Sequence, residues 1–186
     1  MRCGFEVEPL RAAPDEAAEQ VTQLLRGEPV QVEERRDGWA RVRTAYRYPG
    51  WVREQALEEG EGELPAARDG EPVAEARSYL GARYLWGGMT AAGIDCSGLV
   101  HMSYRRLGRL VPRDADQQEA AGREVGEDEL RPGDLITYGE GDRCTHVAFW
   151  LGEGRILHAT NREGLGCVEE REPESLRSAR RKLFRL

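Results

Sequence analysis

The sequence has no long apolar run, few cysteines and no excess of positive charge. No stretch approaches the roughly 18 apolar residues of a membrane-spanning helix, so the sequence predicts no membrane partner. The net charge of -7 argues against a nucleic-acid partner, because phosphate binding requires clustered positive charge. Residues 1–8 lack the apolar core of a secretory signal, which predicts a cytoplasmic protein.

Cysteine and histidine are both scarce. The four cysteines form no CxxC pair and no disulfide framework, which is typical of a reducing compartment. Cys144, His146 and Cys167 could be considered as zinc ligands, but zinc sites favour paired ligands with clear loop spacing. Strand alternation explains Cys144 and His146 without a metal, so the sequence predicts neither a metal nor a cofactor.

Residues 1–60 contain short alternating segments separated by turn signals, which predict a small all-β barrel. Glu28–Glu33 and Trp39–Arg43 alternate between polar and apolar residues, and Pro49-Gly50 is interpreted as a turn. Residues 9–25 fit this pattern less well, and residues 15–25 could equally form a helical turn.

Residues 61–71 are rich in Glu, Gly and Ala and show no apolar period, so we interpret them as a linker. Residues 72–186 read as helices followed by antiparallel strands, which predicts an α+β domain. Pro72 marks one helix start, and a second helix is expected to begin near Cys96 and end before Gly108. Strands are predicted at Asp134–Tyr138, Thr145–Leu151 and Arg155–Thr160.

The tetrapeptide Asp95-Cys96-Ser97-Gly98 places a thiol at the expected start of a helix. The free N–H groups and the dipole of that helix end favour a thiolate, and the same N–H groups can receive an oxyanion. The alternative is that Cys96 is simply a small buried residue, and the tetrapeptide alone favours this alternative. His101 falls off the helical face of Cys96 and is interpreted as a surface or packing residue.

Two of the three histidines, His146 and His158, lie on predicted neighbouring strands. If residues 152–154 form a three-residue hairpin loop, Leu151 lies opposite Arg155, and His146 becomes a diagonal neighbour of His158 at about 7–8 Å. One imidazole could then act as a base while the other fixes its orientation. This pairing favours catalysis over a purely structural role for the histidines.

An ordered series of motifs over about residues 72–165 resembles the NlpC family of papain-like cysteine peptidases. The motifs are Tyr84-Leu85-Trp86-Gly87-Gly88, Asp95-Cys96-Ser97-Gly98-Leu99-Val100, Pro112-Arg113-Asp114, Leu130-Arg131-Pro132-Gly133-Asp134-Leu135, His146-Val147-Ala148 and Leu157-His158-Ala159. The preceding barrel is similar to the bacterial SH3-like module of relatives that recycle cell-wall peptides. Those relatives are gamma-D-glutamyl-L-diamino acid endopeptidases.

The resemblance implies a papain-like catalytic domain and a thioester mechanism without a cofactor. In this chain Cys96 would be the nucleophile and His146 the general base. His158 would be the third polar residue that orients His146. Tyr84 matches a family tyrosine near the nucleophile and would contribute to the oxyanion site.

The resemblance also implies substrate contacts. Asp95 and Ser97 would line the substrate groove, while Asp114 and Tyr48 would meet the free amino end of L-alanine. Asp116 stands where these relatives usually have serine. The added carboxylate either strengthens recognition of an amine or indicates a different substrate.

Several of these residues could also have purely structural roles. Asp95 can cap the helix that follows it, and Asp114 with Gln117 matches a capping box in outline. Trp86-Gly87-Gly88 is expected mainly to pack a turn against the core.

The expected function is hydrolysis of the gamma-D-glutamyl-diaminopimelate bond of free L-Ala-gamma-D-Glu-diaminopimelate peptides in peptidoglycan recycling. Two alternatives remain: an amidase or acyltransferase that acts on another amide or lipid, and a non-catalytic wall-binding adaptor. The sequence leaves the oligomeric state open.

Overall fold

The computed structural model describes residues 1–186, which divide into two compact units, Met1–Ala66 and Ala67–Leu186. The division falls inside the predicted linker, and residues 61–71 contain no helix or strand. Within the first unit, the N–H of Glu63 donates to the carbonyl of Gly27 at 2.9 Å. The beginning of the predicted linker is therefore attached to the first unit.

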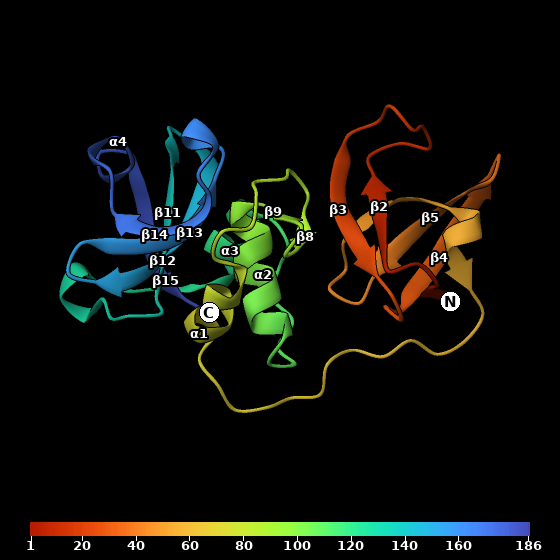
Figure 1. Cartoon of the computed structure of the whole chain (residues 1–186), viewed down its shortest axis with the longest axis horizontal. Helices are drawn as coiled ribbons and strands as arrows, with labels where there is room; N and C mark the ends of the chain where they lie inside the picture. Colours follow the sequence, from red (N-terminus) through yellow and green to blue (C-terminus); the bar gives the residue numbers. More distant parts are fainter. The chain divides into compact units, whose positions relative to one another are not determined.

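The first unit is all-β, as the alternating pattern predicted (Figure 1). Its antiparallel five-stranded sheet has the order β3-β2-β6-β5-β4. The strands are β2 (Val7–Arg11), β3 (Gln20–Leu25), β4 (Val30–Arg36), β5 (Trp39–Thr44) and β6 (Pro49–Arg53), and a separate ladder pairs β1 (Arg2–Cys3) with β7 (Leu57–Glu58). The buried core consists of Cys3, Leu10, Leu24, Val30, Ala40, Val42, Val52 and Ala56.

One predicted turn in this unit is wrong. Pro49 and Gly50 lie inside β6, and the preceding turn is made by residues 45–47, where Arg47 has a φ of 65°. Gly50 is needed for close strand packing rather than for a turn, because a Cβ there would lie 2.5 Å from Leu10 Cγ. Residues 20–25 form β3, which settles the open choice for that segment in favour of a strand.

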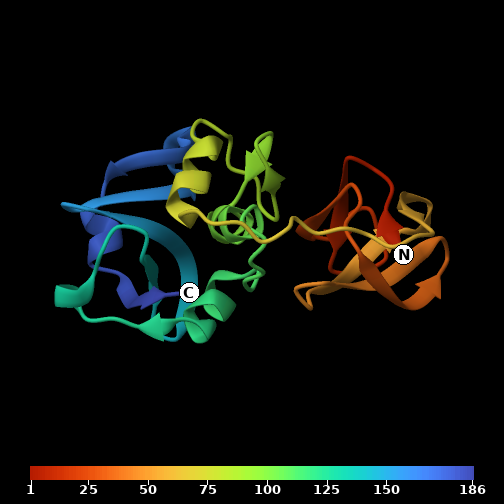
Figure 2. The same ribbon diagram turned by 90° about the horizontal axis from the view of Figure 1, so that it is seen from below.

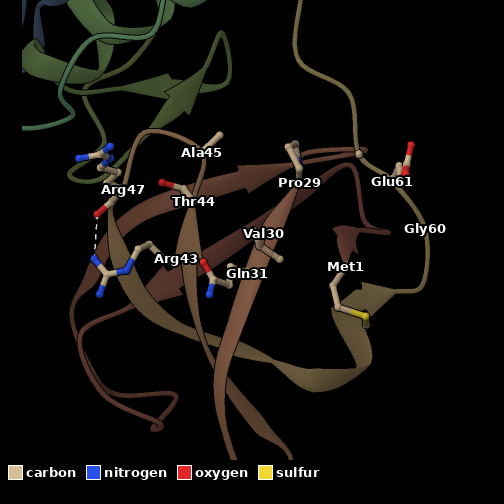
Figure 3. A pocket seen from close by; sticks show the side chains of 11 residues that line it. Met1, Pro29, Val30, Gln31, Arg43, Thr44, Ala45, Arg47, Gly60 and Glu61 are labelled. Carbon is tan, nitrogen blue, oxygen red and sulfur yellow. Dashed lines mark hydrogen bonds between the residues drawn. The ribbon is translucent and has the colours of Figure 1, made fainter.

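A groove of about 730 Å³ lies on the first unit (Figure 3). It is lined by Met1, Pro29, Val30, Gln31, Arg43, Thr44, Ala45, Arg47, Gly60, Glu61 and Gly62. The Arg43 guanidinium donates from Nη1 to the Arg47 carbonyl at 3.2 Å and from Nε to Glu33 Oε1 at 2.6 Å. The charge of Arg43 is therefore already paired within the barrel.

The second unit packs helices on an antiparallel six-stranded sheet of order β10-β15-β11-β12-β13-β14. The strands are β10 (Arg123–Glu124), β11 (Leu135–Glu140), β12 (Arg143–Gly152), β13 (Arg155–Thr160), β14 (Gly166–Arg171) and β15 (Arg180–Arg185), and β8 (Met89–Thr90) pairs with β9 (Gly93–Ile94). The helices are α1 (Pro72–Ala76), α2 (Cys96–Arg105), α3 (Ala115–Ala121) and α4 (Glu174–Arg177). Figures 1 and 2 show α2 and α3 gathered on one side of the sheet, where both contact β12. No helix in the chain is both long enough and apolar enough to cross a membrane.

The central helix α2 forms where the sequence predicted it. Asp95 is its N-cap, with a side-chain oxygen that accepts the N–H of Gly98 at 2.6 Å. All ten residues of α2 are buried, so packing rather than helix propensity stabilises it. The chain leaves the helix through Gly108, which has a φ of 71°.

The hairpin of β12 and β13 has the predicted interior register and a different turn. Phe149 pairs with Leu157 and Trp150 with Ile156, so in the same register Ala148 lies opposite His158. The predicted pairing of Leu151 with Arg155 is wrong, because Gly152 pairs with Arg155 and Leu151 forms a bulge. Glu153 and Gly154 make a two-residue turn with φ values of 51° and 73°, a conformation that matches the twist of the strands.

Candidate active site

Cys96 is the first residue of α2, and its side chain is buried. The backbone N–H groups of Val147 and Ser97 hydrogen-bond the thiol and lower its pKa. Burial and the charge of Asp95 have the larger effect and raise the pKa of the Cys96 thiol to about 12. The contact with Val147 brings Cys96 to the residue that directly follows His146.

His146 and His158 are in direct contact, which confirms the predicted diagonal pairing. His146 Nε2 lies 2.7 Å from His158 Nδ1, and the two rings are nearly perpendicular, with centroids 5.0 Å apart. Burial, followed by the influence of His158 and Arg162, lowers the pKa of His146 to about 3. Burial also lowers the pKa of His158, against the opposing effect of Glu170. Both rings are therefore neutral at pH 7.

The network continues beyond the two histidines. His158 Nε2 lies 2.9 Å from Glu170 Oε1, and Arg162 Nη2 donates to both oxygens of Glu170 at 2.6 Å. Glu170 lies on β14, two residues beyond Val168, the cross-strand partner of His158. Sequence reasoning missed Glu170 and Arg162, because the charged residues at 166–171 give no alternating apolar pattern and no strand was predicted there.

Tyr84 lies close enough to Cys96 for the two groups to interact electrostatically. Burial raises the pKa of the Tyr84 hydroxyl, and the neighbouring groups Cys96 and Asp95 raise it further. Tyr84 therefore keeps its proton at neutral pH and can serve as a hydrogen-bond donor beside the thiol. Its role in the oxyanion site stays a prediction.

Asp95 and Ser97 belong to a buried ion-pair network. Arg113, which is 1% exposed, donates to Asp95 Oδ2 at 2.8 Å and to Asp95 Oδ1 at 3.0 Å. Arg113 Nη1 also donates to Ser97 Oγ at 2.9 Å, and the N–H of Gly87 donates to Asp95 Oδ2 at 2.7 Å. These bonds fix the start of α2 around Cys96. The groove-lining role of Asp95 and Ser97 stays a prediction.

The turn before Cys96 meets the expectation only in part. Trp86 is 58% exposed, whereas Gly87 and Gly88 are buried. The neighbouring glycines connect instead to the buried ion pair, since the carbonyl of Gly88 accepts from Arg113 Nη2 at 3.3 Å. Gly98 is required on the facing helix, because a Cβ there would lie 2.4 Å from the Gly88 carbonyl oxygen.

The other predicted substrate residues are placed as follows. Asp114 occupies the N-cap position of α3, but its side chain makes no capping bond. The side chain instead accepts a hydrogen bond from Gln117 Nε2 at 3.3 Å. The suggested capping box is therefore wrong. Asp116 is exposed in the first turn of α3. Tyr48 is half-buried and packs against the core of the first unit. Their contacts with substrate stay predictions.

The remaining histidine and cysteines do not join this network. His101 is fully buried and therefore a packing residue, with Nδ1 2.8 Å from the carbonyl of Val111. Cys144 Sγ lies 3.8 Å from the carbonyl of His146, and Cys167 is buried. No group of three or more His, Cys, Asp or Glu residues is arranged to hold a metal ion.

Stability is expected to fall as the pH drops below about 6.5. Burial lowers the pKa of His101 and of His146 to about 3 and also lowers the pKa of His158. The unfolded chain therefore binds more protons than the folded protein between about pH 6.5 and pH 3, and the free energy of unfolding decreases across that window. A tenfold difference in proton affinity corresponds to about 1.4 kcal/mol. The free energy of unfolding should therefore fall by several kcal/mol between about pH 6.5 and pH 3.

Urea denaturation at pH 7.5, 6.5 and 5.5 measures this effect, because most carboxylates titrate near pH 4, below that range. The variant His101→Gln should reduce the pH dependence while keeping a donor for Val111. An unfolding free energy that stays constant from pH 7.5 to 5.5 would contradict the prediction.

Comparison with known proteins finds a matching family for each of the two units. Residues 81–180 match the NlpC/P60 family, and residues 10–57 match the bacterial dipeptidyl-peptidase Sh3 domain. The chain is 40% identical over 84 residues to a gamma-D-glutamyl-L-lysine dipeptidyl-peptidase of Bacillus subtilis, covering 44% of this chain and 28% of that protein. It is 36% identical over 96 residues to the murein DD-endopeptidase MepS/murein LD-carboxypeptidase of Escherichia coli, covering 51% of each.

A solved structure matches over nearly the whole chain. An NlpC/P60 family protein from Bacillus cereus superposes with a TM-score of 0.58 at 23% identity, covering 99% of this chain and 62% of that one. At this identity the match shows the fold alone. The chain spans less than two thirds of the length of these three relatives.

Proposed function

Because the chain belongs to the NlpC/P60 family, we propose that it is a cysteine peptidase that hydrolyses amide bonds of cell-wall peptides. The observation that carries the proposal is the position of Cys96 at the start of α2. Its thiol contacts the N–H of Val147, next to the hydrogen-bonded pair of His146 and His158. A nucleophile, a base and a residue that orients the base are the groups that acyl transfer requires.

The proposed bond is the gamma-D-glutamyl-diamino acid bond. Support comes from the likeness of the chain to a gamma-D-glutamyl-L-lysine dipeptidyl-peptidase and from the match of its first unit to the Sh3 domain of bacterial dipeptidyl-peptidases. The chain is also similar to a murein DD-endopeptidase, so cleavage of a D,D-bond is the natural competing outcome.

The reaction begins with a neutral thiol and a neutral imidazole, because burial raises the pKa of Cys96 and lowers that of His146. As the sulfur of Cys96 attacks the side-chain carbonyl carbon of D-glutamate, its proton passes to His146. The N–H groups of α2 that precede Gly98 hold the oxyanion, because the first turn of a helix has no intrahelical acceptors for them, whereas the N–H of Gly98 is bound by Asp95. Coupling the proton transfer to the attack avoids a buried, unpaired thiolate.

The tetrahedral intermediate collapses when His146 donates its proton to the leaving amine of the diamino acid. The carbon–nitrogen bond breaks and a thioester on Cys96 remains. Water then attacks the thioester while His146 takes a proton from that water, and the proton returns to the departing sulfur. The products are a free gamma-carboxyl group and the regenerated thiol.

We further propose that the substrate carries a free amino end, as L-alanine does in a free muropeptide. Asp114 and Asp116 at the start of α3 supply two carboxylates for an ammonium group, which needs such a partner when it leaves water. A blocked amino group would lack that charge, so N-acylated peptides and sugar-linked stems are expected to be poor substrates.

Mass spectrometry of L-Ala-gamma-D-Glu-meso-diaminopimelate after incubation with the protein tests both proposals. Release of L-Ala-D-Glu from the free peptide, with at least about tenfold slower release from its N-acetylated form, is the expected result; a tenfold change corresponds to about 1.4 kcal/mol of recognition. The variant Cys96→Ala serves as the negative control. Equal turnover of both peptides would refute the amine contact, and cleavage only of a D,D-linked peptide would refute the proposed bond.

A further inference from the structure

The hydrogen-bond network of His146 and His158 has a third and a fourth member, Glu170 and Arg162, that the proposed mechanism does not use. His146 on β12, His158 on β13 and Glu170 on β14 form one diagonal row across three adjacent strands. Such diagonal neighbours share a face of the sheet and lie within reach of long side chains. Arg162 closes the row through both oxygens of Glu170. The row is therefore built on paired strands, which hold its members in a fixed order.

We infer that Glu170 is a positioning residue that fixes the protons of both histidines and leaves Nδ1 of His146 as the bare nitrogen that serves as the base. The inference rests on the proposed function, because it assigns a task to the same catalytic base. It goes beyond that function by naming what determines the protonation pattern.

The argument begins at Glu170. Its carboxylate is paired with the Arg162 guanidinium, and an ionised carboxylate can only accept hydrogen bonds. The proton between Glu170 Oε1 and His158 Nε2 therefore belongs to His158 Nε2, at a separation of 2.9 Å. A neutral imidazole carries one proton, so His158 Nδ1 is left as an acceptor.

The same reasoning applies to the next pair along the row. Because His158 Nδ1 accepts, the proton in the 2.7 Å contact belongs to His146 Nε2. Neutral His146 then has no proton on Nδ1, the one nitrogen that the row leaves free for the thiol proton of Cys96. Burial lowers the pKa of both rings, so each carries a single proton at neutral pH.

The opposite arrangement would disable the base. If His158 carried its proton on Nδ1, that proton would be donated to His146 Nε2, and the single proton of His146 would move to Nδ1. His146 could then accept nothing from Cys96. Glu170 excludes this arrangement, because a bare His158 Nε2 would face a carboxylate without a proton between them, and the buried contact would become repulsive.

Two substitutions separate a proton-fixing role from a purely structural one. Glu170→Leu removes the acceptor, whereas Glu170→Gln keeps it, because Oε1 would face two donors, His158 Nε2 and Arg162 Nη2. Glu169→Leu is the matched control: it removes a charge from the neighbouring position of β14, whose carboxylate instead contacts Arg77 and Arg155.

The expected result for Glu170→Leu is a fall in kcat of about 10²-fold or more with KM little changed, in the range that general-base catalysis supplies. Glu170→Gln should retain kcat within about tenfold, and Glu169→Leu should match the unsubstituted protein. Alkylation of Cys96 by iodoacetamide should slow in Glu170→Leu only.

Nitrogen NMR of histidine-labelled protein reads the proton positions directly, and the chain has only three histidines to assign. We expect protonated Nε2 and bare Nδ1 on both His146 and His158 in the unsubstituted protein and in Glu170→Gln, with the pattern reversed in Glu170→Leu. A proton on His146 Nδ1 in the unsubstituted protein overturns the inference even if Glu170→Leu fails to fold. A folded Glu170→Leu variant with native kcat and native nitrogen pattern also overturns it.

The failure of the proposed function would be recognised separately. If the unsubstituted protein cleaves none of the wall peptides, the substrate proposal fails. The nitrogen spectra and the alkylation rates still decide the role of Glu170, because neither measurement needs a peptide.

Discussion

Turnover of the wall peptide should fall to the level of the buffer control when Cys96 is replaced by alanine, because the thioester route has no other nucleophile. Replacing His146 by alanine should lower kcat by about 10²–10⁴-fold, the usual contribution of a positioned general acid and base. The physical reason is that the Cys96 thiol and the His146 imidazole are both neutral before the reaction begins. Burial raises the pKa of Cys96 to about 12, so at pH 7 the thiol reacts only if a base takes its proton.

The matched control for this prediction is Cys144→Ala. Cys144 is the one cysteine that is not buried, and its sulfur contacts the backbone carbonyl of His146 and the carboxylate of Glu119. Its replacement should leave kcat within about twofold. Peptide release followed by mass spectrometry, together with labelling of Cys96 by iodoacetamide, checks both variants. Retention of activity by Cys96→Ala would show that a different group attacks the substrate.

Asp95→Ala is expected to cost about 3–5 kcal/mol of unfolding free energy, the range for breaking one partner out of a buried ion pair. Arg113 is 1% exposed and donates to both oxygens of Asp95, so the substitution leaves a buried guanidinium without its carboxylate. The same substitution removes the N-cap of α2, which adds about 1 kcal/mol. Urea denaturation at pH 7.5 measures the change.

A double variant and a control at a partly exposed ion pair sharpen this test. Asp95→Ala combined with Arg113→Leu should recover part of the loss, since no unpaired charge then remains in the interior. Glu169→Ala removes a carboxylate whose partners, Arg77 and Arg155, are about half exposed, and it should cost no more than about 1 kcal/mol. A loss below 1 kcal/mol for Asp95→Ala would mean that Arg113 finds water or another partner.

Local patterns were sufficient for much of the fold. The alternation of Trp39–Arg43 and of Thr145–Leu151 predicted strands that the structure confirms as parts of β5 and β12. The signals at Asp95 and Gly108 bracket α2 correctly. These patterns work because a half-buried strand or a capped helix is encoded within a few neighbouring residues. The error at Pro49-Gly50 arose because a glycine needed for close strand packing carries the same local signal as a turn.

Three strands of the six-stranded sheet, β10, β14 and β15, escaped prediction for a different reason. β14 and β15 carry many charged residues, including Glu169 and Glu170 on β14. A charged strand has no alternating apolar face, so local patterns do not reveal it. In the structure Glu170 on β14 pairs with Arg162, and Arg180 on β15 pairs with Glu172, the residue that follows β14.

The sequence by itself determined the cysteine at the helix start, the capping aspartate and the contact between His146 and His158, because each depends on residues close together in the chain. Only the tertiary structure decided what surrounds them. Arg113 reaches Asp95 through buried side-chain bonds, and Glu170 reaches His158 from a strand that local patterns did not reveal. Long-range contacts of this kind depend on which elements pack together, and that choice is made by burial of the whole core rather than by any local spacing.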